Sequence, residues 1–329
     1  MNAPALELSA ALTTNERTRP LLDGEVAPQA VRLLTSGLHP SEIFWRQLKH
    51  AEFDVSEMSL SSLLIATSKG DRTWAALPVF TSRTFYHTLI LVRADAGIAA
   101  PADLRGKRVG VPEYQQTAAV WSRGVLQHEF GVMPGEIDWF MERTPERSHG
   151  DATGFRPPPG VTVTPIPPDR NIGSMLLDGS LDATLLYLRE RNLVDRSTAD
   201  LEGSSAVHPL FDAAREGPRY FAKTGIFPIN HAVVVRRTLL ERHPWVALNL
   251  YEAFVAAKEH ARHRALAALV PYAAIGAVPG RATARDPLPY GLRENRHVLE
   301  TLAGYVHEQG LSDRRVALDE VFVSSTLDV

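Results

Sequence analysis

The feature that most constrains the fold of this chain is a recurring order of segments. Short apolar runs are followed by polar turns and then by amphipathic stretches. Residues 5–12 and 31–34 are apolar runs that end in turn-prone polar residues and lead into amphipathic stretches. The order recurs at 53–55, which precedes the amphipathic stretch 56–67. Each unit is typical of a strand, a loop and a helix. A chain built of such units predicts an α/β fold.

The pattern continues along the rest of the chain. Strands are predicted at 77–80, 88–92, 182–186 and 230–235, and helices at 112–130, from Pro244 onward, and at 294–309. Gly131 suits the C-cap of the first of these helices. We expect the last helix to pack on the first lobe, because its apolar residues would otherwise be exposed. Residues 143–168 are dense in proline, glycine, serine and charge, which indicates a mobile loop.

Length and charge limit the classes of function. With 329 residues, 44% of them hydrophobic, the chain can bury one large core or two of ordinary size, which is the usual range for two domains. A formal net charge of −3 gives no global field that attracts nucleic acid or an anionic membrane, so a bound anion must meet locally placed donors. The chain has no cysteine, which excludes disulfides, thiolate metal sites and cysteine nucleophiles.

The N-terminal stretch 1–14 has no basic residue before its short apolar run. It lacks the layout of a secretory signal, so we expect a cytoplasmic protein. The alanine-rich stretch 245–270 carries charged residues such as Lys258 and Arg262, and no segment predicts a membrane span.

Candidate ligand-binding residues follow the predicted strands. Ligands of open α/β sheets collect at the carboxyl ends of strands, where helix N-termini present free N–H groups. The residues at these positions are rich in hydroxyls, amides and cations: Asn15 to Thr18 with Arg17, Thr35-Ser36, Glu57 to Ser59, Ser82-Arg83, Tyr114-Gln115-Gln116-Thr117 and Asn171. This inventory suits a carboxylate ligand. For each serine or threonine alone, a helix cap without a ligand is the favoured explanation.

Arg83 and His87 lie in a short segment with two aromatic residues between two apolar strands. An aromatic ligand could stack there while Arg83 binds its carboxylate. A loop whose aromatic residues cover the edge of the core is the alternative. His231 at the start of a buried strand is a second candidate, although structural histidines are common at such positions, and Glu57 either caps a helix or acts on ligand.

Other catalytic and metal motifs are missing. There is no His-Glu-x-x-His, no glycine-rich phosphate loop and no Gly-x-Ser-x-Gly elbow. His260 and His263 lie one helical turn apart without a third ligand, which indicates a solvated helix face.

Six strings of residues resemble 4,5-dihydroxyphthalate decarboxylases. They are 53–62, 77–87, 110–121, 224–231, 243–246 and 286–292, and the likeness runs from about Arg17 to Gly310. One departure occurs at Thr14 to Thr18, where the family leads us to expect an aromatic residue and an aspartate just before the arginine.

The resemblance implies a two-lobed α/β fold like that of type II periplasmic binding proteins, with a ligand cleft between the lobes. We expect residues 1–92 and 236–329 to form lobe 1 and residues 93–235 to form lobe 2. The residues that the resemblance places in the cleft are Arg17, Glu57, Ser59, Arg83, His87, Tyr114, Gln115, Thr117 and His231.

The implied reaction, part of phthalate catabolism, is decarboxylation of 4,5-dihydroxyphthalate to protocatechuate by ring-carbon protonation, without an organic cofactor. Our hypothesis assigns His87 as the acid, Glu57 or His231 to the phenol, and Arg17 and Arg83 to the carboxylate that remains. A divalent metal held by Glu57, His87 and His231 is an open alternative.

The alternative function is a non-catalytic solute-binding protein for a small aromatic or sulfonate-like anion. Such a protein would bind the anion through the same residues. The acid–base side chains and the missing export signal favour the enzyme. We expect a small aromatic carboxylate as the substrate, with no nucleic acid or membrane partner, and a homodimer is the working expectation for the oligomeric state.

Overall fold

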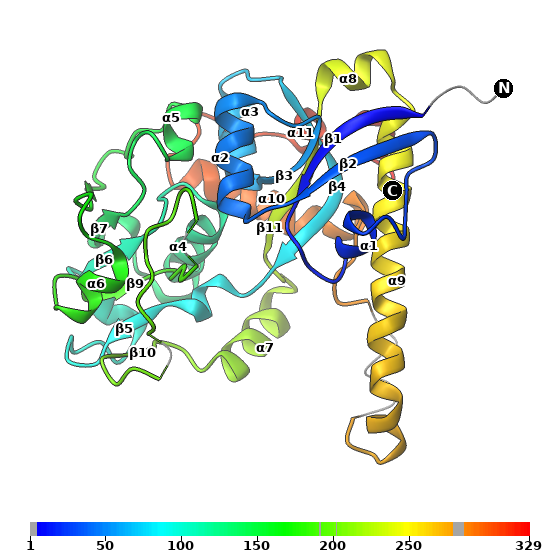
Figure 1. Ribbon diagram of the computed structural model, residues 1–329. Coiled ribbons are helices and arrows are strands. Elements are labelled where there is room, and N and C mark those ends of the chain that lie inside the picture. The colour runs from blue at the N-terminus through cyan, green and yellow to red at the C-terminus, as the bar shows by residue number, and fades with distance from the viewer. Residues whose placement is uncertain (1–4, 191, 202, 279–285) are drawn as a thin grey trace.

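A computed structural model describes residues 5–190, 192–201, 203–278 and 286–329. The chain forms two lobes, each built on one β-sheet, and the two sheets lie in different halves of the molecule (Figure 1). The α/β fold with two lobes is confirmed. Among the described residues, no helix is long and apolar enough to cross a membrane.

The first sheet has five strands in the order β2-β1-β3-β11-β4. Strand β1 is parallel to its neighbours β2 and β3, whereas β11 lies between β3 and β4 and is antiparallel to both. The bounds of the strands are β1 Leu6–Leu12, β2 Val31–Gly37, β3 Val55–Ser59, β4 Trp74–Arg83 and β11 Ile229–Arg236. Every residue of β3 is buried, which fits its position at the centre of the sheet.

The second sheet has six strands in the order β10-β5-β9-β6-β7-β8. Its strands are β5 Leu91–Arg93, β6 Arg108–Val111, β7 Asp138–Met141, β8 Val163–Pro165, β9 Ala183–Thr184 and β10 Val207–Pro209. The chain passes between the sheets twice, from β4 to β5 and from β10 to β11. The predicted lobe boundaries stay a prediction. In the sheets, residues 91–93 belong to the second sheet and residues 229–236 to the first.

Helices cover both sheets. Their bounds are α1 Arg19–Leu22, α2 Pro40–His50, α3 Leu60–Ser68, α4 Thr117–Phe130, α5 His149–Thr153, α6 Ile172–Leu177, α7 Ala213–Thr224, α8 Arg237–Arg242, α9 Val246–Ala274, α10 Leu292–Glu308 and α11 Leu318–Val321, with short 3₁₀ turns at η1 Tyr86–Leu89, η2 Pro101–Leu104, η3 Pro134–Glu136 and η4 Ser324–Thr326.

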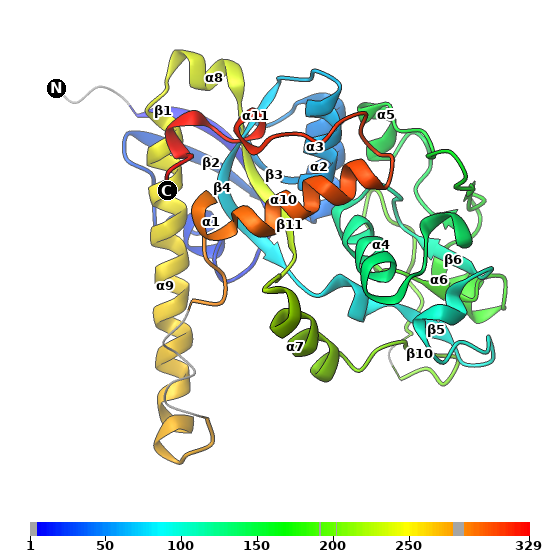
Figure 2. The ribbon, with the colours of Figure 1, turned by 180° about the vertical axis from the view of Figure 1, so that it is seen from behind.

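Helix α10 holds the two lobes together from behind (Figure 2). It contacts α3, as expected, and also α4 of the second lobe. A Cβ on Gly124 of α4 would lie 2.1 Å from the ring of Tyr305 of α10, so only glycine permits this close approach. Gly131 ends α4 at φ 68°, which confirms the predicted C-cap.

Two local predictions were wrong. Residues 86–89 form a 3₁₀ turn, and the strand predicted at 88–92 covers only 91–93. The segment 143–168 contains α5 and the edge strand β8, and its first part is buried by ionic contacts described below. Its proline and glycine content reflects tight turns, and contacts from distant residues hold it in place.

Candidate active site

A cavity of about 300 Å³ lies between the two lobes. Its walls carry Ser59, Ser82 and His231 from the first sheet and Gln116, Thr117, Arg143 and His149 from the second lobe, together with His39, Ser41 and Phe44 from the start of α2. Its volume is at the lower end of the range of about 300–1,000 Å³ for small-molecule sites. The cavity suits one small ring.

Three helix N-termini meet at this cavity. Ser41 lies in the first turn of α2, Ser59 is the N-cap of α3, and Thr117 begins α4. Free N–H groups and the helix dipoles make such ends favourable for anions. The cavity therefore has the local donors that the sequence requires of an anion site.

Thr117 joins the two lobes. Its Oγ1 lies 2.9 Å from Oγ of Ser59 and accepts a hydrogen bond of 2.9 Å from the backbone N–H of Ser61. Ser59 itself makes no side-chain cap to α3. The hydroxyl of the second lobe thus caps the helix of the first, and the Ser59 side chain contacts Thr117 instead of capping its own helix.

The imidazole of His231 stands against a buried carboxylate. Its Nδ1 lies 3.1 Å from Oε2 of Glu57. The other oxygen of Glu57 accepts hydrogen bonds from N and Oγ1 of Thr13 at 2.8 and 2.6 Å. Thr81 Oγ1 donates to Oε2 at 2.6 Å. The structure brings Glu57 and His231 together, and both carboxylate oxygens of Glu57 accept hydrogen bonds.

These contacts keep Glu57 ionised. Burial by itself raises the pKa of this carboxyl, but the hydrogen bonds from His231, Thr13 and Thr81 outweigh burial and hold the pKa below its ordinary value. An ionised carboxylate can only accept, so Nδ1 of His231 carries hydrogen and donates. The amide nitrogen of Asn230 lies 2.8 Å from Nε2.

Arg143 and its partners form the opposite side of the cavity. The Arg143 side chain is 2% exposed, and its Nε donates to Oδ1 of Asp195 at 2.8 Å. One terminal nitrogen donates to Oγ of Ser41 at 2.7 Å. The charge of Arg143 and its hydrogen bond overcome burial and lower the pKa of Asp195 to about 2. Arg143, which is held by Asp195 in a buried ion pair, thus links the second lobe to α2 through Ser41.

His149 is held as a neutral donor. Nη1 of Arg143 lies 3.2 Å from its Nε2, and because a guanidinium only donates, Nε2 accepts. Burial, aided by the charge of Arg143, lowers the pKa of His149 well below its ordinary value. The proton of the neutral ring is therefore on Nδ1. Among the described residues this atom has no hydrogen bond of normal geometry, although the Ser41 backbone is close enough to affect the pKa.

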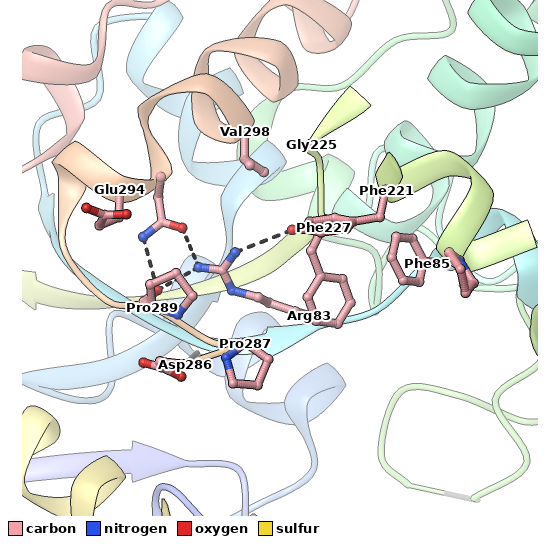
Figure 3. A pocket seen from close by; sticks show the side chains of 12 residues that line it. Arg83, Phe85, Phe221, Gly225, Phe227, Asp286, Pro287, Pro289, Glu294 and Val298 are labelled. Carbon is pink, nitrogen blue, oxygen red and sulfur yellow. Dashed lines mark hydrogen bonds between the residues drawn. The ribbon is translucent and has the colours of Figure 1, made fainter. Parts of the chain in front are cut away.

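Arg83 faces a different cavity. Ser82 and Thr84 line the interlobe cavity, whereas Arg83 and Phe85 line a separate pocket of about 510 Å³, as alternate residues of a strand do. The guanidinium donates to the carbonyl of Pro289 at 2.7 Å and to the side chain of Asn295 (Figure 3). Burial, and then the charge of Arg17, lower the pKa of Arg83 to about 10.

His87 also lies outside the interlobe cavity. Its Nε2 is 3.1 Å from Oε1 of Glu216, and the ring packs against Tyr220 and Phe211 at centroid distances of 5.2 and 5.5 Å. Burial lowers the pKa of His87 despite Glu216. The structure thus separates His87 from Glu57 and His231.

The remaining predicted residues lie outside the interlobe cavity. Arg17 donates to the carbonyl of Thr81, the residue that also bonds Glu57. The ring of Tyr114 is buried under the guanidinium of Arg123, 3.8 Å from its centroid. Oε1 of Gln115 accepts from Thr153 at 2.8 Å. None of the three lines the interlobe cavity.

Ser41, Arg143 and His149 were missed from sequence. Arg143 follows the carboxyl end of β7, so the strand-end rule that found Thr117 would have found it if β7 had been predicted. In the described ranges, no group of three or more histidine, aspartate or glutamate side chains is placed to hold a metal ion. Glu57, His87 and His231 do not form such a set.

Two sheets between which the chain crosses twice, with a cavity between the lobes lined by donors that suit an anion, define a protein of the periplasmic-binding-protein fold. Solved structures agree. The alkanesulfonate-binding protein SsuA from Xanthomonas axonopodis pv. citri, bound to MOPS, superposes with a TM-score of 0.58 at 13% identity, covering 98% of this chain and 99% of that one. A mutant of the desulfurization enzyme DSZB in complex with biphenyl-2-sulfinic acid gives 0.54 at 15% identity, covering 98% and 97%. At these identities the likeness concerns the fold alone.

Sequence comparison identifies the family. The chain is 36% identical over 334 residues to the 4,5-dihydroxyphthalate decarboxylase of Comamonas testosteroni, with 98% of both chains covered. It is 41% identical over 180 residues to that of Pseudomonas putida, which covers 55% of this chain and 70% of that protein. No family model matches the chain. The chain belongs to the 4,5-dihydroxyphthalate decarboxylase family.

Proposed function

We propose that this protein is a non-oxidative carboxy-lyase that converts 4,5-dihydroxyphthalate to protocatechuate and carbon dioxide in the interlobe cavity. The observation that carries the proposal is the pair of histidines in one cavity with opposite environments, His231 against an ionised carboxylate and His149 against a guanidinium. Family membership names the substrate. Two ring nitrogen groups in one cavity, one beside a carboxylate and the other beside a guanidinium, are typical of acid–base sites.

The reaction replaces a carboxylate with a proton at one ring carbon. The hydroxyl para to that carboxylate supplies electron density, the carbon takes a proton, and the carbon–carbon bond then breaks so that its electron pair restores the aromatic ring. Carbon dioxide leaves. The protein must supply a proton donor at the carbon, a group that accepts or polarises the phenolic proton, and donors for the second carboxylate.

His231 is the proton donor in this proposal. It lines the cavity, and Glu57 behind it is ionised and stabilises positive charge on the ring during the step in which the imidazole carries the proton. Thr13 and Thr81 are positioning residues because they hold Glu57.

His149, Arg143 and the N-termini of α2 and α4 hold the anionic groups of the substrate. A neutral His149 with hydrogen on Nδ1 is a hydrogen-bond donor and a poor acid, which suits a carboxylate oxygen of the substrate. The positive helix ends favour the carboxylate that remains. Phe44 offers an apolar surface, since its ring lies 4.6 Å from His231 and 5.8 Å from His149 between centroids.

The sequence-based roles of His87 as acid and of Arg17 and Arg83 as clamps stay predictions that this geometry does not favour, since none of them lines the cavity. A cytoplasmic location likewise stays a prediction. The solute-binding alternative has less support, because the curated relatives are decarboxylases.

The test is to mix purified, metal-stripped protein with 4,5-dihydroxyphthalate and to follow carbon dioxide and protocatechuate, with and without added divalent metal. We expect turnover by the wild type. In His231→Gln, kcat should fall by about 10²–10⁴ while ligand affinity changes less than about tenfold. His208→Gln, at an exposed histidine outside the cavity, is the control. Ligand binding without turnover in the wild type would instead favour a binding protein.

A further inference from the structure

Three residues that line the interlobe cavity stand in one row across the first sheet. His231 of β11 is in register with Ser59 of β3 on one side and with Ser82 of β4 on the other. The pairing of β4 with β11 shifts its register on both sides of His231, and such bulges re-aim side chains next to active sites. Neighbouring strands lie about 4.7–4.9 Å apart, so the row suits one substituted ring lying along it.

One end of the row has donors for an anion. Oγ of Ser59 contacts Thr117 where the N-termini of α3 and α4 meet. Gln116 is the N-cap residue of α4, is buried and lines the cavity. Its Nε2 has no hydrogen-bond partner within the described ranges. An unpartnered buried donor beside two positive helix ends suits a carboxylate.

The other end of the row is a pair of neutral hydroxyls. Oγ of Ser82 lies 3.2 Å from the hydroxyl of Tyr86, which also lines the cavity. Burial raises the pKa of Tyr86 well above its ordinary value, and the hydrogen bond with Ser82 offsets only part of this shift, so the phenol stays protonated. Because the pair shares one O–H, it keeps one O–H to donate and lone pairs to accept.

We propose that Ser82 and Tyr86 recognise the two neighbouring hydroxyls of the substrate and polarise the hydroxyl para to the departing carboxylate. This inference rests on the proposed function, since it orients the substrate of that reaction. The carboxylates lie toward Gln116 and the helix ends, and the ring carbon that is protonated lies over His231. The hydroxyls lie one strand spacing further along the row, at Ser82.

The Ser82–Tyr86 pair matches two neighbouring hydroxyls because it can accept a hydrogen bond from one of them and donate to the other. When the pair accepts from the para hydroxyl, it increases the electron density on that oxygen. The ring carbon para to it then takes its proton more readily. Neither role needs a charged side chain at this end of the cavity, and Tyr86 stays neutral there.

The first test compares two ligands that differ only in the two hydroxyls. Protocatechuate and benzoate each have one carboxylate, so calorimetry measures their Kd without turnover of 4,5-dihydroxyphthalate. We expect the wild type to bind protocatechuate about tenfold more tightly, because each hydroxyl finds a partner. Tyr86→Phe should weaken protocatechuate by about tenfold and leave the Kd of benzoate unchanged.

Two further variants complete the comparison. Gln116→Leu removes a donor at the carboxylate end and should weaken both ligands by the same factor. Tyr251→Phe removes the hydroxyl of a partly buried tyrosine outside the cavity and should change neither Kd. Equal weakening of both ligands in Tyr86→Phe, or a wild type that does not prefer protocatechuate, overturns the proposal.

Turnover gives a second readout. With 4,5-dihydroxyphthalate, kcat of Tyr86→Phe should fall by about 10²-fold, because the phenolic oxygen is no longer polarised, whereas Tyr251→Phe should match the wild type. Circular dichroism and Tm establish that each variant is folded. Normal kcat in Tyr86→Phe overturns the proposed polarisation and leaves the decarboxylase function intact. A wild type that prefers protocatechuate through Tyr86 but shows no turnover supports the recognition and contradicts the proposed function alone.

Discussion

Nδ1 of His231 lies 3.1 Å from Oε2 of Glu57, and the carboxylate is entirely buried behind the ring. The antiparallel pairing of β11 with β3 sets this contact, since His231 is in register with Ser59 and Val233 with Glu57. The two side chains therefore sit two positions apart on neighbouring strands, where long side chains still meet. This pairing fixes the tautomer of the histidine at the cavity.

Glu57→Gln should reverse that tautomer. Glutamine has the same shape, and its Oε1 can accept from Thr13, which leaves its NH₂ group facing Nδ1 and moves the hydrogen of His231 to Nε2. We expect kcat to fall by about 10²–10⁴ with little change in KM. Nitrogen NMR of the labelled histidine ring reports the tautomer directly. Asp54→Asn, at a carboxylate just before the same strand, is the control, and an unchanged kcat in Glu57→Gln would remove the pair from the mechanism.

His87→Gln should affect stability more than turnover. His87 packs among Phe211, Tyr220 and Glu216 and does not line the interlobe cavity. Glutamine keeps a donor for Glu216 but loses the ring contacts, so the variant should lose about 1–3 kcal/mol of unfolding free energy. Urea denaturation and steady-state kinetics measure both effects. Loss of turnover with unchanged stability would restore the sequence-based role of His87 as the acid.

Much of the site was predictable because helix N-termini follow strand ends in an open α/β fold. That rule, together with the family resemblance, found Ser59, Thr117, Glu57 and His231, which the structure does bring together. It could not give the direction of each side chain. Ser82 and Arg83 are neighbours at the end of β4, yet Ser82 lines the interlobe cavity and Arg83 lines a separate pocket, because successive side chains of a strand point to opposite sides.

Arg143 and His149 could not be predicted by this rule, for a different reason. Their segment has the composition of a loop, and what orders it is long-range: Asp195 is 52 residues from Arg143, and Ser41 is 102 residues away. Periodicity describes neighbours in sequence and carries no information on such pairs. The buried Glu113, which accepts from Ser148 and the backbone of His149, completes an ionic network that no local pattern encodes.

Asp195→Ala should be strongly destabilising. Arg143 is buried, so loss of Asp195 leaves a buried charge whose remaining ion pair within the described ranges is with Glu113, 4.0 Å away. Breaking a buried pair in this way costs about 3–5 kcal/mol. Asp200→Ala is the matched control, because its pair with Arg189 is exposed and such pairs contribute about 0–1 kcal/mol. Urea unfolding of both variants measures the difference, and equal losses would mean that the Arg143 cluster does not hold the lobes in this arrangement.

His149 should make the protein less stable as the pH falls. Its pKa is well below the ordinary value of 6.5, first because it is buried and then because Arg143 repels a second positive charge. Below about pH 6.5 the unfolded chain takes up a proton at this residue while the folded chain does not, so the unfolding free energy decreases by up to about 1.4 kcal/mol per pH unit. His39 and His87, whose pKa values burial also lowers, act in the same direction, so the difference between wild type and variant isolates His149. We expect the slope of unfolding free energy between pH 6.5 and 5 to be shallower in His149→Gln than in the wild type, measured by urea denaturation, with His208→Gln as the control for replacing a histidine. Parallel curves for His149→Gln and wild type would show that His149 is protonated in the folded protein, and its proposed role as a neutral donor at the cavity would then be wrong.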